Sequence, residues 1–162
     1  AFCDEMTRAL GVAVAPAASA EAMVREADIL VTVTTAASPL FDGDWLPAGC
    51  HVNAAGSNAL IRRELDEKAV RRAGLVCVDS RPTALAEAGD LLPLLEKGRL
   101  HERQLVELGE LVAGRHPGRS DAAQITLFES QGMAIQDLAV AARLLSLARQ
   151  RGLGQELALG KI

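Results

Sequence analysis

The chain has 162 residues, of which 49% are hydrophobic and only 2% aromatic, and its net charge is −4 at pH 7. This length is enough for one domain with a core built mainly from Ala, Val and Leu. The acidic balance and the lack of a basic run argue against a nucleic-acid partner, and no apolar stretch is long enough to span a membrane. Cys3, Cys50 and Cys77 are odd in number and widely spaced, which fits neither a disulfide framework nor a zinc site and favours a reducing, cytoplasmic setting.

The first half of the chain is predicted to alternate between helices and short strands. Apolar runs rich in Val and Ile and bounded by turn residues are typical of buried strands, and Ser19 is a good helix N-cap. The expected elements are a helix over 1–10 with Gly11 after its last turn, a strand at 12–14, a helix from Ser19 to about residue 27, a strand over 29–33, a turn or one-turn helix over 41–47, a strand over 51–55 and a helix over 63–73.

The second half continues this alternation and ends in the longest helix. The expected elements are a strand over 75–78, helices over 83–88, 91–97 and 105–113, a polar loop over 114–121, a strand over 124–128 and a helix from Met133 to about Arg151. Strands that alternate with helices indicate a parallel sheet with right-handed crossovers. We therefore expect an α/β fold, with a parallel sheet flanked by helices and a long C-terminal helix.

The last helix is predicted to be apolar on two sides. The first stripe consists of Ile135, Leu138, Ala142 and Leu145, and the second consists of Val140, Leu144 and Leu147. A helix of this kind is expected to be buried on two sides, against the sheet and against a second domain or subunit. The alternative is a plain central core helix.

The stretch from Ala27 to Asn58 carries the candidate site. Its two predicted strands end in small or hydroxyl residues, Thr34 and Thr35 after the first and Gly56–Asn58 after the second. In open parallel sheets, ligands bind at the carboxyl ends of the strands, where small side chains let a flat cofactor approach the backbone. The alternative is that these residues only terminate the strands, since turn residues are common there.

The Gly-rich turn of a dinucleotide-binding fold does not occur in the sequence. No G-x-G-x-x-G is present, and Gly152-Leu153-Gly154 follows a helix and lacks the third glycine. Together with a first helix that has no preceding strand, this predicts a fragment without its first βαβ unit. An uncovered sheet edge and an apolar helix face would then favour self-association or a partner chain.

Five sequence blocks resemble the ornithine cyclodeaminase/mu-crystallin family, in its order and at its spacing. They are ADILVTVTTAASPLF, HVNAAGSNALIRRELD, LVCVDS with the downstream AGDLLPLLEKG, ELGELVAGRHPGR, and ITLFESQGMAIQDLAVA, and they cover nearly the whole chain from Ala27 onward. Members of this family are homodimeric enzymes with a Rossmann NAD(P) domain and a separate substrate domain. The resemblance implies an incomplete Rossmann-like NAD(P)-binding domain over residues 1–131. It implies that the helix and tail over 132–162 contact the substrate domain or a partner chain.

The same resemblance implies hydride chemistry on a small substrate. The parent protein is expected to be a cytoplasmic homodimer that moves hydride between NAD or NADP and the α-carbon of a small amino or imino acid, as a ketimine reductase or amino-acid dehydrogenase. Two alternatives are an ornithine cyclodeaminase, which converts ornithine to proline and ammonia, and a non-enzymatic NAD(P)H-binding mu-crystallin-like protein. The lysine and arginine residues that hold the substrate in this family belong to the N-terminal domain, so the 162-residue chain alone is expected to be inactive.

The resemblance also implies roles for individual residues. Thr34 contacts the cofactor at a strand tip, Asn53, Ala54 and Ala55 lie against its nicotinamide half, Arg62 replaces a basic residue close to it, Ser130 lies near the nicotinamide amide, and Gln131 follows on the substrate side. Asn58 stands where the cyclodeaminases have an aspartate that activates water or transfers a proton. An amide cannot take up a proton in this way, so Asn58 favours a reductase or dehydrogenase. We expect Thr34, Asn53–Ala55, Asn58 and Ser130 to line one mostly apolar cleft.

Structural roles remain open for several polar residues. Glu64 and Asp66 suit the start of a helix, where acidic side chains interact well with the helix dipole, and Asp79-Ser80 suits a turn. Ser130 suits a capping position ahead of the last helix, a role compatible with cofactor contact because a helix N-terminus also attracts anions.

Overall fold

The computed structural model describes residues 1–155 and 157, which separate into two compact units, Ala1–Gln131 and Gly132–Ile162. The tail at 156 and 158–162, which we expected to contact another domain or chain, lies outside the described residues. The helices are α1 (Phe2–Leu10), α2 (Ala20–Arg25), α3 (Glu67–Arg72), α4 (Arg81–Glu87), α5 (Leu92–Glu96), α6 (Leu108–Val112) and α7 (Ala134–Arg151), with 3-10 turns η1 (Gly43–Trp45) and η2 (Glu102–Gln104). The strands are β1 (Ile29–Thr32), β2 (His51–Ala54), β3 (Leu75–Val78), β4 (Leu105–Glu107) and β5 (Thr126–Glu129).

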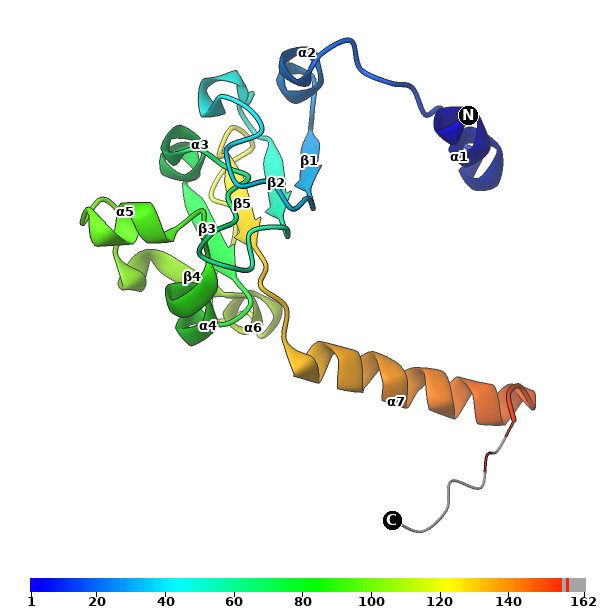
Figure 1. The fold of residues 1–162 in the computed structure, drawn as a ribbon. Helices are drawn as coiled ribbons and strands as arrows, with labels where there is room; N and C mark the ends of the chain where they lie inside the picture. The colour runs from blue at the N-terminus through cyan, green and yellow to red at the C-terminus, as the bar shows by residue number, and fades with distance from the viewer. Residues whose placement is uncertain (156, 158–162) are drawn as a thin grey trace. The chain divides into compact units, whose positions relative to one another are not determined.

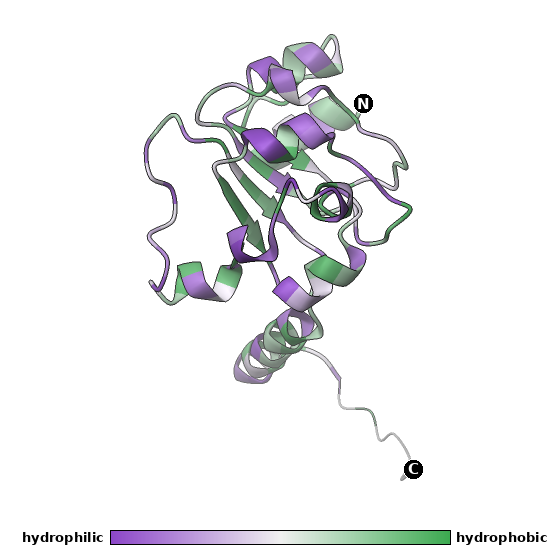
Figure 2. Ribbon diagram, turned by 90° about the vertical axis from the view of Figure 1, so that its left-hand side faces the viewer, coloured by the Kyte–Doolittle hydropathy of each residue, from purple (hydrophilic) through white to green (hydrophobic). Residues whose placement is uncertain are grey.

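The first unit is built on one parallel sheet, as the alternating pattern predicts. Its strands lie in the order β1-β2-β5-β3-β4, and every neighbouring pair is parallel (Figure 1). The last strand in the sequence, β5, is therefore the central one, hydrogen-bonded to β2 on one side and β3 on the other. Hydrophobic residues dominate the strands, as is typical of parallel sheets (Figure 2).

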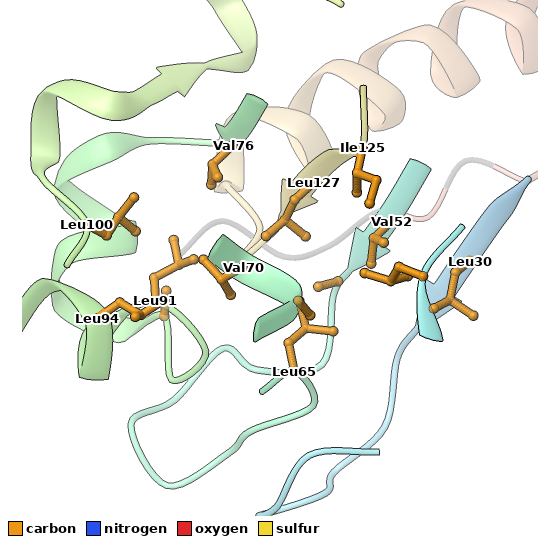
Figure 3. Close-up of a cluster of buried hydrophobic side chains, with 14 of the residues drawn as sticks. Leu30, Val52, Leu65, Val70, Val76, Leu91, Leu94, Leu100, Ile125 and Leu127 are labelled. Carbon is orange, nitrogen blue, oxygen red and sulfur yellow. The ribbon is translucent and has the colours of Figure 1, made fainter. Parts of the chain in front are cut away.

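One face of the sheet carries the core. The register places Leu30, Val52, Leu127, Val76 and Leu105 in one row across the five strands, and all five are buried. Side chains from the connecting segments, among them Leu65, Val70, Leu91 and Leu94, complete this cluster (Figure 3). Since strand side chains alternate between faces, the next row on the same face is Thr32, Ala54, Glu129 and Val78.

Two predicted helix starts are shown to be incorrect. The helix expected from residue 63 begins only at Glu67, because the Glu64 and Leu65 amides donate to Asp90 Oδ1 and the Asp66 side chain caps the Ala69 amide at 2.7 Å. The helix expected over 105–113 begins at Leu108, because residues 105–107 pair with β3 as strand β4. A short apolar run does not distinguish a strand from the first turn of a helix.

The strand expected at 12–14 is also absent, although the helix before it ends as predicted. Gly11 adopts the left-handed conformation, with φ 68°, after α1. The Val14 amide and carbonyl both bond the Thr7 hydroxyl, at 3.0 and 3.4 Å, instead of a neighbouring strand. Backbone groups that bond a side chain locally are not available for a sheet ladder.

The second unit contains α7 as its one described helix. This helix has the predicted extent and ends at Gly152 in the left-handed conformation. None of its residues is buried, and its apolar residues Ile135, Leu138, Val140, Leu144 and Leu145 are exposed, so neither a central core helix nor burial on two sides is found within the described chain. A search of the described helices finds none that is both long and apolar enough to cross a membrane.

Candidate functional site

The carboxyl ends of the strands meet at one edge of the sheet. Backbone pairing continues past the strands there, because Ala55 N donates to Thr32 O at 2.9 Å and Ser130 N donates to Ala54 O at 2.8 Å. Thr34, the 56–58 turn and Ser130 follow these strands directly. They therefore lie along the edge where ligands bind in open parallel sheets.

Glu64 joins the ends of β1 and β2. Its side chain is fully buried, and its two oxygens accept hydrogen bonds from Thr34 N at 2.5 Å and Gly56 N at 2.9 Å. A Cβ on Gly56 would lie 2.4 Å from Thr34 O and equally close to the Glu64 carboxyl carbon. Only glycine fits at this position, because the two strand ends and the carboxyl group leave no room for a side chain.

A second buried tie joins the ends of β2 and β5. Ser57 Oγ donates to Glu129 Oε1 at 2.6 Å and accepts from Asp90 N at 3.4 Å. Ser57, Glu129 and Asp90 are all buried. Ser57 thus attaches the turn that carries Asn58 to Glu129 and Asp90, and all three residues are buried.

Further ties continue along the edge to β3 and β4. Ser130 Oγ donates to Asp79 Oδ2 at 2.8 Å, which joins the ends of β5 and β3. The Arg81 amide, at the start of α4, donates to Glu107 Oε1 at 2.9 Å, which joins the segment after β3 to β4. Asp79 is therefore more than a turn residue, since it holds the hydroxyl of the proposed cofactor ligand Ser130.

Asn58 and Arg62, two of the predicted site residues, lie together. Arg62 Nη1 donates to Asn58 Oδ1 at 2.8 Å, on the exposed side of the turn. The amide oxygen of Asn58 is occupied by this bond, so its NH₂ group is the part that can donate to a ligand. The neighbouring Thr34 is also exposed, and its hydroxyl accepts from Ala36 N at 3.1 Å.

Other predicted site residues are placed differently. Asn53 belongs to the row Val31, Asn53, Phe128 and Cys77 on the opposite face of the sheet, where it lines an open hollow of about 410 Å³ with His51, Phe128 and Leu108. Ala54 is buried on the core face, and its carbonyl accepts the hydrogen bond from Ser130 N. Ala55 is exposed. The Gln131 amide donates back to Glu129 Oε1 at 3.2 Å. That Thr34, Asn53–Ala55, Asn58 and Ser130 line one cleft stays a prediction.

Burial changes the acidity of two carboxyl groups below the edge. Desolvation, followed by repulsion from Asp90, raises the pKa of Glu129 well above its usual value. Burial also raises the pKa of Asp90, although the Leu65 and Glu64 amides oppose that change. Charged carboxylates are costly to bury, so such groups tend to keep a proton.

The sequence did not predict the buried polar residues that join the strand ends at this edge. The sequence predicts no site role for Asp90 or Glu129, Ser57 appears only among the residues that end the second strand, and Glu64 appears only as a helix start. A signal was present for Glu129, because it directly follows the apolar run Ile125–Phe128 and so falls within the strand. For Asp90 no comparable signal exists, because its role depends on contacts with segments more than 20 residues away.

The donor set of the edge fits the ribose hydroxyls and the carboxamide of a nicotinamide dinucleotide better than its pyrophosphate. The amides of Thr34 and Gly56 are already committed to Glu64, so they form no anion-binding nest. Exposed amide and hydroxyl groups of Asn58 and Thr34 suit ribose hydroxyls or a carboxamide. Among the described residues, no group of three or more His, Cys, Asp or Glu side chains could hold a metal ion.

The parallel sheet and its polar carboxyl edge define a Rossmann-like α/β protein. The chain belongs to the ornithine cyclodeaminase/mu-crystallin family, whose family model matches residues 1–150. It is 39% identical over 135 residues to the Delta(1)-pyrroline-2-carboxylate reductase of Bacillus cereus, covering 83% of this chain and 41% of that protein. It is 41% identical over 126 residues to the mouse ketimine reductase mu-crystallin, covering 78% and 37%.

A solved structure gives the same picture. The Delta(1)-pyrroline-2-carboxylate reductase of Thermococcus litoralis, solved in complex with NADH and L-proline, matches with a TM-score of 0.90 and 36% sequence identity. The match covers 96% of this chain and 48% of the other. The chain thus spans less than half the length of each of these three relatives.

Proposed function

We propose that the whole protein is an NAD(P)-dependent reductase of small imino acids, of the ketimine reductase type. The observation that supports this proposal is the carboxyl edge of β1, β2 and β5, where Thr34, the 56–58 turn and Ser130 follow the strands and buried Glu64, Ser57 and Glu129 join the strand ends by hydrogen bonds. Relatives named as imine reductases align with about four-fifths of the chain. When bound, a reduced nicotinamide supplies hydride for the imino carbon.

The roles proposed for the site residues are those that the resemblance to the family implies. Thr34 and Ser130 hold the cofactor, with Ser130 oriented by its bond to Asp79, and Arg62 steadies Asn58. Residues 53–55 support the nicotinamide half, and Gln131 lies on the substrate side through its position in the chain, while its side-chain amide donates to Glu129 Oε1. Asn58 orients the amino or imino acid by its amide and cannot serve as a general base.

We further propose the organisation expected from the family. Residues 1–131 form part of an NAD(P)-binding domain, and the exposed apolar sides of α7 contact a substrate domain or the second chain of a homodimer. The protein acts in the cytoplasm, and the 162 residues alone are inactive because the remainder of the site is supplied from outside them.

An activity assay tests this function. The protein is produced with all flanking sequence that its gene encodes and incubated with NADH or NADPH and a cyclic imino acid such as Δ1-pyrroline-2-carboxylate. We expect oxidation of the cofactor and formation of the amino acid. Release of ammonia from ornithine, without any imino-acid reduction, would instead identify a cyclodeaminase, and cofactor binding without turnover would identify a binding protein.

A variant at Asn58 sharpens the assignment. Asn58→Asp introduces a titratable carboxylate beside Arg62, so the pH profile of kcat/KM should gain an additional ionisation. A matched Asn58→Ser variant adds no charge and should leave the shape of the profile unchanged. Identical profiles for the Asp variant and the wild type would show that position 58 does not reach the reacting atoms.

A further inference from the structure

Three buried side chains below the carboxyl edge form a cluster with an excess of hydrogen-bond acceptors. Glu129 is fully buried on the core face of β5, in the row between Ala54 and Val78. Asp90 is 2% exposed, and its backbone amide donates to the Ser57 hydroxyl that in turn donates to Glu129 Oε1. Among the ion pairs found in the described residues, none includes Glu64, Asp90 or Glu129.

A donor is missing from this cluster. Glu129 Oε1 accepts from Ser57 and Gln131, and Asp90 Oδ1 accepts from the Glu64 and Leu65 amides. Glu129 Oε2, Asp90 Oδ2 and Gln131 Oε1 are buried and have no donor among the described residues. Leaving buried polar atoms unpaired is costly, and two charged carboxylates there would also repel each other. A single proton on one carboxyl removes one charge and turns one acceptor into a donor.

We infer that Glu129 and Asp90 hold one proton between them in the native protein at neutral pH. This uncharged carboxyl is a positioning group, because it keeps Ser57, and with it the 56–58 turn, attached to the end of β5. The inference does not depend on the proposed enzymatic function, since it rests only on contacts within this chain.

Burial and the neighbouring carboxylates favour the protonated state of Glu129. Repulsion from Asp90 and Glu64 adds to desolvation in raising the pKa of Glu129, while bonds from Ser57 and Gln131 oppose the change. On the neighbouring strand β3, Asp79 follows the residue in register with Glu129 and bears another carboxyl. Two arginine side chains bond residues next to the cluster in the sequence. Arg63 Nε donates to Gly89 O at 3.2 Å, and Arg62 donates to Asn58.

This arrangement predicts that the native protein loses stability as the pH rises. The carboxyl has its ordinary pKa of about 4.3 in the unfolded chain and a higher one in the folded chain. Its stabilising contribution is therefore complete below about pH 4.3 and declines above it, until the pH passes the folded-state pKa. In this window one retained proton changes the unfolding equilibrium constant by about tenfold per pH unit.

The test compares the 162-residue chain with its Glu129→Gln variant. Glutamine keeps the size of the side chain, accepts from Ser57 and supplies the missing donor without a charge. From pH 5.5 to 7.5, we expect the unfolding equilibrium constant of the wild type to rise about tenfold per pH unit relative to that of the variant. The exposed Glu87→Gln is the matched control and should follow the wild type. Parallel pH dependences of wild type and Glu129→Gln would overturn the inference.

Infrared spectroscopy keeps the inference testable if the variant does not fold. At pH 7, wild-type chain should show the carbonyl band of a protonated carboxylic acid, whereas exposed carboxylates give none. The band should be lost in Glu129→Gln and retained in Glu87→Gln. A wild-type spectrum at pH 7 without such a band would overturn the inference, whatever the variants do.

Discussion

The two faces of the sheet use the same strands in different ways. On one face, Leu30, Val52 and Leu127 form a buried row that continues across all five strands. On the other, Ile29 and Val31 are exposed, while Asn53 and Phe128 border an open hollow. Adjacent residues of equal hydrophobicity therefore differ in what they contribute. Apolar content identifies the strand, but only the register shows which side chains stabilise it.

The largest expected effect is a contrast between neighbours on β1. Leu30→Ala removes a side chain that is 4% exposed from the core row and should cost about 2–5 kcal/mol of unfolding free energy. Val31→Ala truncates a side chain that is 59% exposed and should change stability by about 0.5 kcal/mol or less. Urea unfolding of both variants measures the difference. Equal losses would mean that the Val31 face is covered in solution.

A smaller loss of unfolding free energy is expected when Glu64, which lies where the core face meets the carboxyl edge, is replaced. Glu64→Gln replaces one of the two oxygens that bind the Thr34 and Gly56 amides with an NH₂ group, which cannot accept a hydrogen bond. We expect a loss of about 1–3 kcal/mol in the same unfolding experiment. The exposed Glu87→Gln should be neutral. A Glu64→Gln variant as stable as the wild type would show that this tie does not hold the ends of β1 and β2 together.

The smallest expected effect is a difference in alkylation rate, which reports whether reagents reach Cys77 on the face of the sheet opposite the core. Cys77 lines the hollow, yet it is buried, and desolvation raises its pKa to about 11. At pH 8 only about one Cys77 thiol in a thousand is then the reactive thiolate. Cys3, which is partly exposed, should be alkylated by iodoacetamide at least about tenfold faster, as followed by mass spectrometry of the native protein. Equal rates would show that the hollow is open to solvent down to β3.

Much of the fold follows from local sequence, and the exceptions have physical causes. Four of the five strands were predicted, because each is a short run in which apolar residues recur, with turn residues near its ends. Strand β4 was wrongly predicted as the start of a helix. Leu105–Glu107 forms a strand because it pairs with β3, which lies almost 30 residues earlier in the sequence, and no local pattern shows that pairing. For residues 12–14 the error is the reverse. A strand was predicted and none forms, because the backbone groups of Val14 bond the Thr7 hydroxyl.

Of the candidate site, only the residues that directly follow the strands could be predicted from the sequence. Thr34 and Asn58 follow strands, so their places could be inferred from the rule that parallel strands share a carboxyl edge. The buried hydrogen bonds beneath them depend on Glu64, Asp90 and Glu129, whose partners come from separate segments of the chain. A carboxyl group that stabilises a distant turn has no periodic signature in the sequence.

Hydrogen exchange in the presence of NADH tests the central claim most directly, in the protein with all flanking sequence that its gene encodes. We expect NADH to slow amide exchange at the carboxyl edge, within residues 34–36, 55–58 and 130–131. We expect no comparable slowing at Leu108, Leu111, Gly118 and Arg119, which line the hollow on the opposite face. Protection confined to the hollow, or no protection at the edge at saturating NADH, would contradict the assignment of this edge as the cofactor site.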